Sequence, residues 1–166
     1  MLILDYRLSP GWRAQAAEKD LRSASTEALH YDLFLGDVIF RSNGADFSAA
    51  WDLVPVLDFA MSLLRIAREL RTSDSQRFEF TESEATLHFE RHGDQVQISS
   101  SYSPGSVVVP YEDLQRAAEG FAQRMVQELA TEFPEIADAQ AFQLCQQEVL
   151  SPPRPACPPQ KLHLDP

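Results

Sequence analysis

The sequence WDLVPVLDFAMSLLRIARELR, residues 51–71, is the longest strongly apolar stretch of the chain and decides its fold. Apolar side chains fill most of the circumference of a helix drawn through this stretch, so we predict a helix over residues 52–71 that is covered on two or more sides. Asp52 is the expected N-cap, and Pro55 falls in the first turn, where no intrahelical amide bond is lost. Four polar residues at steps of four, three and four form one narrow stripe: Asp58, Ser62, Arg65 and Glu69.

The same stretch is a poor candidate for a membrane span. Asp58 and Arg65 would lie in the hydrocarbon, where each charged side chain costs about 2.5–3.5 kcal/mol. We therefore expect a buried helix of a protein that does not enter the membrane.

Composition and charge narrow the class of protein. A chain of 166 residues with 44% hydrophobic residues has the length and composition of one globular domain. Its net charge of −11 argues against nucleic acid as a partner, because phosphate contacts need clustered Lys and Arg. An acidic surface instead favours solubility and the attraction of basic proteins.

The cysteines and the N-terminus indicate a cytoplasmic protein. Cys145 and Cys157 have no metal-ligand spacing, and residues 1–12 lack the basic and apolar regions of a signal peptide. Both thiols are expected to be reduced in the cytoplasm.

The N-terminal half reads as strands. Residues 2–8 alternate, with Leu2, Leu4, Tyr6 and Leu8 on one face, and residues 12–17 are predicted as a second strand. Residues 18–26 read as a loop, with a short helix as the alternative. Residues 30–41 form a strand bent at Gly36, followed by an Asn-Gly hairpin turn at residues 43–44 and a return strand over residues 45–48.

A hairpin over residues 85–102 is the clearest β signal. A two-residue turn at Gly93 and Asp94 pairs Phe89 with Ile98 and leaves His88 on the opposite, polar face. Residues 77–81 alternate, so that Phe78 and Phe80 point inward, and residues 107–109 form a short strand.

Two further helices and a tail complete the chain. Residues 111–133 are regularly amphipathic, and residues 135–150 form a less regular helix. The tail, residues 151–166, carries six of the eleven prolines and is predicted to be extended or disordered. We predict an α+β fold over residues 1–150: a largely antiparallel sheet of about five to seven strands, with the helices at 52–71 and 111–133 on one face.

Motifs for chemistry are missing from the sequence. It has no glycine-rich phosphate loop, HExxH, CxxC or nucleophile elbow, so we predict no enzyme activity, no metal and no cofactor. His88 with Glu90 is the nearest acid/base pair, and we interpret it as a surface ion pair. Glu82 and Glu84 sit in a solvated corner, and Cys145 has no basic neighbour in sequence to lower its pKa.

The order of elements, with the hairpin FEFTESEATLHFERHGDQVQISSSY (residues 78–102) and VVVPYEDLQRAAEGFAQRMVQEL (residues 107–129), resembles small acidic immunity proteins of bacterial polymorphic and contact-dependent toxin systems. The resemblance covers residues 1–150 and rests on the order of the elements and on composition, with no functional motif. It implies direct, non-catalytic binding to a cognate toxin domain, with acidic side chains making the contacts.

The acidic corner and the hairpin supply the candidate contact residues Glu79, Glu82, Glu84, Glu90 and Asp94. The alternative for these five is a sheet edge kept charged against aggregation. An immunity role predicts a flat or convex acidic face. A wide apolar groove would favour an adaptor or chaperone that holds a partner peptide, and a deep pocket with convergent polar groups would favour a ligand-binding domain or an enzyme.

Overall fold

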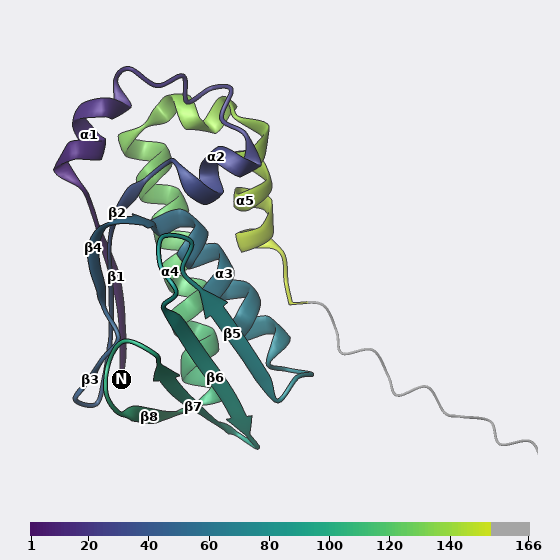
Figure 1. Cartoon of the computed structure of the whole chain (residues 1–166). Coiled ribbons are helices and arrows are strands. Elements are labelled where there is room, and N and C mark those ends of the chain that lie inside the picture. Colours follow the sequence, from purple (N-terminus) through teal and green to yellow (C-terminus); the bar gives the residue numbers. More distant parts are fainter. Residues whose placement is uncertain (154–166) are drawn as a thin grey trace, which may run out of the picture.

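The computed structural model describes residues 1–153, in which helices and strands alternate in blocks (Figure 1). The elements in chain order are β1 (Leu2–Leu8), α1 (Pro10–Ala16), α2 (Thr26–Tyr31), β2 (Leu35–Ser42), β3 (Ala45–Asp46), β4 (Ala49–Pro55), α3 (Val56–Glu69), β5 (Ser75–Glu79), β6 (Thr86–His92), β7 (Gln95–Ser100), β8 (Ser106–Pro110), α4 (Tyr111–Glu132), the 3₁₀ helix η1 (Pro134–Asp138) and α5 (Gln140–Leu150).

The strands are antiparallel, which confirms the predicted α+β class, but they form two sheets and not one. In sheet A, β2 lies between β1 on one side and β3 and β4 on the other. Sheet B has the order β5-β6-β7-β8. The division was not predictable because it depends on which distant strands pair.

Helices α3 and α4 lie behind sheet B and beside sheet A in Figure 1, and they join the two sheets. Helix α3 contacts β2, β4 and β5, and α4 contacts β1, β7 and β8. The two helices also contact each other, and buried side chains from both sheets and both helices belong to one hydrophobic cluster. Helix α5 packs against α2, α3 and α4.

The predicted helix over residues 52–71 is wrong in its first turn. Helix α3 begins at Val56, and the preceding residues form β4, which pairs with β2 through Leu35–Pro55 and Gly36–Val54. Asp52 is not the N-cap: its φ is +63°, and its N–H donates to Asp37 Oδ1 at 2.9 Å. The continuous apolar run conceals this boundary, since an apolar strand and an apolar helix look alike over five residues.

The predicted strand over residues 12–17 is also wrong. Pro10 stands in the first turn of helix α1, where its fixed φ favours a helix, and Trp12 is buried on the inner side. The strand predicted over residues 30–41 begins only at Leu35, because His30 and Tyr31 complete α2 and Phe34 turns the chain with a φ of +56°.

Other predictions are confirmed. The hairpin has the expected register, with Phe89 opposite Ile98, and the Asn43-Gly44 turn connects β2 to β3. Helix α4 occupies residues 111–132, and the less regular third helix is divided into η1 and α5. The predicted tail lies outside the described residues from 154 onward. No helix within residues 1–153 is long and apolar enough to cross a membrane.

Candidate functional site

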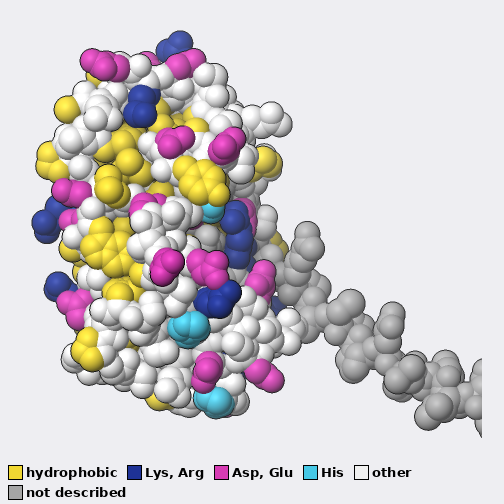
Figure 2. Space-filling view, in the orientation of Figure 1, with side chains coloured by type: hydrophobic (Ala, Val, Ile, Leu, Met, Phe, Trp, Pro, Cys, Tyr) yellow, Lys and Arg dark blue, Asp and Glu magenta, His cyan; other side chains and the backbone are white. Residues whose placement is uncertain are grey.

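A groove of about 950 Å³ runs between helix α3 and strand β5. The polar stripe recognised in the sequence faces it, and residues of β5 and the end of α2 complete its walls. Figure 2 shows charged and histidine side chains gathered over sheet B, whereas hydrophobic side chains gather over the opposite side of this face. The stripe is therefore not an ordinary solvated helix face but one wall of a groove.

The two walls run in opposite directions and match in length. The chain reverses between α3 and β5, and the ring of Phe59 lies 5.1 Å from the ring of Phe78, so the start of the helix lies beside the end of the strand. From Asp58 to Glu69 the helix rises about 16 Å, and the groove-lining residues Ser75 to Phe80 on the other wall, five steps of an extended chain, also span about 16 Å.

His30 and Asp58 form a close pair at the end of the groove near α2. His30 Nδ1 lies 2.5 Å from Asp58 Oδ1, and only 11% of the Asp58 side chain is exposed. Burial raises the pKa of Asp58, and the contact with His30 acts in the opposite direction. The half-exposed ring of Tyr31 packs edge-on against His30 at 4.2 Å.

Arg65 is fixed by a carboxylate from α5. Its Nε and Nη2 donate to the two oxygens of Glu148 at 2.7 and 2.8 Å, a bidentate geometry that holds the guanidinium in place. The hydrogen bonds from Arg65 lower the pKa of Glu148. On the other wall, Arg77 forms an ion pair with Glu79. Both arginines of the groove are thus already neutralised by carboxylates.

Strand β5 is a terminal strand of sheet B, and the ladder shows which backbone groups face outward. Arg91 N donates to Asp74 O, and Phe80 N donates to Ala85 O. In an antiparallel ladder, hydrogen-bonded residue pairs alternate with non-hydrogen-bonded pairs. The backbone groups of Gln76 and Phe78 therefore also bond to β6. The N–H and C=O groups of Arg77 and Glu79 therefore point away from the sheet.

Three of the five predicted contact residues lie at one end of this groove. Glu79 lines it, and Glu82 and Glu84 are exposed in the turn that follows Thr81, another lining residue. The other two lie elsewhere. Glu90 is exposed on β6, with a carboxylate oxygen 3.9 Å from His92 Nε2, and Asp94 occupies the turn at the far end of the hairpin.

The five acidic residues are therefore not one patch. Glu84 and Asp94 flank the seven-residue strand β6, which separates them by about 20 Å. His88 faces the groove and contacts Thr86 Oγ1 at 2.9 Å rather than pairing with Glu90 as predicted.

Cys145 lies beside the groove, in a second cavity that also contains His30 and Asp58. Burial raises the pKa of its thiol, which keeps it protonated and poorly nucleophilic. Among residues 1–153, no group of three or more His, Cys, Asp and Glu side chains is arranged to hold a metal ion.

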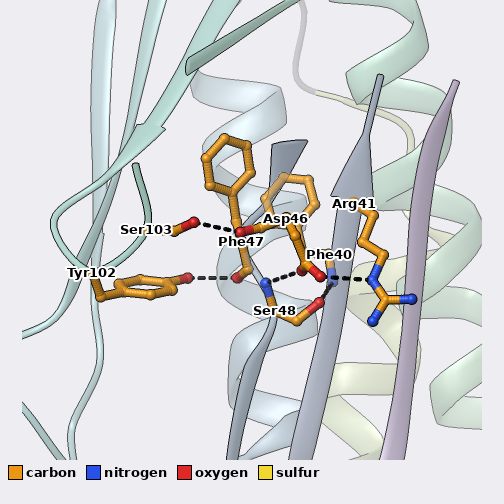
Figure 3. Close-up of polar contacts among 7 residues, drawn as sticks. All are labelled: Phe40, Arg41, Asp46, Phe47, Ser48, Tyr102 and Ser103. Atoms are coloured by element: carbon orange, nitrogen blue, oxygen red, sulfur yellow. Dashed lines mark hydrogen bonds and ion pairs between the residues drawn. The ribbon is translucent and has the colours of Figure 1, made fainter. Parts of the chain in front are cut away.

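A second polar cluster joins the two sheets (Figure 3). Tyr102 Oη donates to Phe47 O at 2.6 Å, and Ser103 Oγ donates to Asp46 O at 2.7 Å. Asp46 in turn accepts from Ser48 N and from Arg41 Nε. These side chains satisfy backbone groups of the β3–β4 connection, so we interpret the cluster as a structural joint.

Comparison with known proteins adds no family or fold relative. No protein-family model matches the chain, and searches of curated proteins and of solved structures found no match.

Proposed function

We propose that this chain is a non-catalytic protein-binding protein that captures a basic partner at the groove between α3 and β5. The observation that carries the proposal is that an open strand edge and several carboxylates meet in one groove. Asp58, Glu69 and Glu79 line it, and Glu82 and Glu84 continue from its end. Asp58 contacts His30, Glu79 pairs with Arg77, and Arg65 pairs with Glu148, so Glu69, Glu82 and Glu84 carry the acidic excess. A net charge of −11 adds long-range attraction for a basic protein.

The biological role that we propose for this binding is neutralisation of a bacterial toxin domain. Its support is the resemblance of the sequence to acidic immunity proteins. That resemblance implied a flat or convex acidic face, whereas the groove is concave, so the proposed contact is a protruding segment of the partner. We also propose a cytoplasmic location, since Cys145 is a free thiol, the form that a reducing compartment maintains.

A charge-reversal experiment tests the site. We expect a tagged wild-type protein to capture one basic protein from the source cells, and the triple variant Glu79→Lys, Glu82→Lys, Glu84→Lys to bind it at least about tenfold more weakly. The matched control reverses three exposed carboxylates elsewhere on the described surface, Glu18→Lys, Glu112→Lys and Glu135→Lys, with the same change in net charge. Equal loss of binding in both variants would show that the groove is not the site.

A small ligand is a second candidate, favoured by the convergence of His30, Asp58, Ser62 and His88 in a groove whose volume lies in the range of ligand pockets. If the groove binds a small ligand, we expect a thermal-shift screen of a metabolite library to find a compound that raises the unfolding temperature of the wild type but not that of His30→Ala. An equal response of both proteins would place the compound outside the groove.

A further inference from the structure

We propose that the partner binds by strand addition: an extended basic segment pairs with the outer edge of β5 and extends sheet B into the groove. This inference rests on the proposed function and specifies its mode of binding. Main-chain hydrogen bonds to the sheet edge would supply affinity, and alternate side chains of the added strand would supply specificity.

The outward backbone groups of Arg77 and Glu79 are the first reason. Each residue presents one N–H and one C=O on the side of β5 that faces away from β6. Both residues are exposed, so these groups are accessible to another chain. They lie two residues apart, which is the spacing at which an added strand forms its bonds.

The contrast with the opposite edge of sheet B is the second reason. Tyr111 N donates to Asp94 O, so these two residues form a hydrogen-bonded pair of the β7–β8 ladder. Because such pairs alternate along the ladder, the backbone nitrogens of Val108 and Pro110 lie on the outer side of β8. Pro110 has no N–H, and a proline on an edge discourages pairing with other chains. Strand β5 contains no proline, so its edge lacks this protection.

The groove has the dimensions and charge for one extended segment. Its two walls, the stripe of α3 and strand β5, have matching lengths, and a strand added to β5 would have the stripe along its flank. Successive side chains of a strand point to opposite faces, so every second side chain of the added strand would point toward α3. A long basic side chain on the face toward α3 would meet the exposed Glu69 at one end of the stripe. The middle of the stripe holds Ser62 and the paired Arg65, and Asp58 at the other end is mostly buried beside His30.

A proline placed on the free edge tests this directly. Arg77→Pro removes an outward N–H without removing a ladder bond to β6, and Arg77→Ala removes the same side chain but keeps the N–H. Val108→Pro is the matched control on the edge of β8. The probe is a fluorescein-labelled peptide of alternating lysine and valine, and the readout is fluorescence anisotropy. We expect Arg77→Pro to bind at least about tenfold more weakly than Arg77→Ala, which lacks the same side chain, and Val108→Pro to bind as the wild type does.

Wild-type protein provides a test that does not depend on the folding of a variant. Two versions of the peptide carry N-methyl groups on alternate residues, one set odd and the other even. Strand addition requires that one version loses binding and the other keeps it, because only one set of amides faces β5. Equal affinity of both methylated peptides and the parent, or no binding of the parent, would overturn strand addition. Loss of the captured partner in the groove triple variant, without an effect of Arg77→Pro, would leave the proposed function standing and remove only this mode of binding.

Discussion

Single residues set the backbone geometry of the sheets, and Gly36 in β2 is the most constrained of the glycines. A Cβ atom at this position would lie 2.0 Å from the carbonyl oxygen of Arg7, across the β1–β2 ladder. Backbone cannot yield as a flexible side chain can, so we expect Gly36→Ala to lower the free energy of unfolding by about 3 kcal/mol. Denaturant unfolding measures the change.

Gly11→Ala is the control for this substitution. The nearest atom to its Cβ would be Ser9 Oγ at 3.6 Å, an ordinary contact, and alanine favours the helix by up to about 1 kcal/mol. If Gly36→Ala were as stable as Gly11→Ala, the close approach of β1 and β2 at this point would be wrong.

The Arg65–Glu148 pair predicts a pH dependence of stability. Arg65 lowers the pKa of Glu148 below its ordinary value of 4.5, so the folded state releases the proton more readily than the unfolded state. The stabilisation is therefore fully present above about pH 4.5 and is lost as pH falls through the lower folded pKa. About half of the Arg65 side chain is exposed, so we expect the pair to contribute only about 1 kcal/mol to the free energy of unfolding at neutral pH.

The variant Glu148→Gln isolates this effect. Its stability deficit relative to the wild type should be present at pH 7 and should shrink toward zero in acid, where the wild-type carboxyl is also neutral. Glu135→Gln, an exposed residue 3.9 Å from Arg22, should show no such trend. A deficit that is constant with pH would contradict the pairing.

Among the elements, the joint between the sheets is the easiest to perturb. Tyr102→Phe removes the hydroxyl that donates to Phe47 O (Figure 3) but keeps the ring. The ring lies 5.3 Å from that of Trp51 and 5.6 Å from that of Phe80. We expect a loss of about 1 kcal/mol in the free energy of unfolding. Tyr6→Phe, whose hydroxyl contacts the exposed Glu128, should cost less. Equal losses would mean that the joint adds nothing beyond an exposed hydrogen bond.

Elements with local signals were predictable from the sequence. The two-residue turn at Gly93 and Asp94 determines the hairpin register, and α4 has a regular apolar period over its whole length. The boundary between β4 and α3 was not predictable, because only pairing with Leu35 and Gly36 keeps residues 54 and 55 in a strand. Pro10 marks the start of α1, but in the sequence a proline at the start of a helix looks the same as a proline in a turn between two strands.

The candidate site was only half visible in the sequence. The polar stripe of α3 followed from its spacing, yet its role as a groove wall depends on β5 and on His30, which lie beside it only in the folded chain. The acidic residues were chosen by their proximity in sequence. The fold places Glu79, Glu82 and Glu84 at one end of the groove but carries Glu90 and Asp94 away from it, because a strand separates neighbours in sequence.

On the scale of the whole molecule, charge predicts how binding responds to salt. The net charge of −11 steers a basic partner toward the protein, and salt screens this attraction over a distance of about 10 Å at 0.1 M. We expect the association rate of the captured partner to fall steeply with added salt, while its dissociation rate changes less. Surface plasmon resonance measures both rates, and an association rate independent of salt would contradict a role for the acidic surface.

Amide exchange at β5 distinguishes strand addition from binding at any other surface. We would record the exchange rates of individual backbone amides by NMR, with and without the captured partner. Strand addition predicts that the amides of Arg77 and Glu79 become protected on binding, while the outward amide of Val108 on β8 is unchanged. Protection at a distant surface, with Arg77 and Glu79 exchanging as fast as in the free protein, would contradict it.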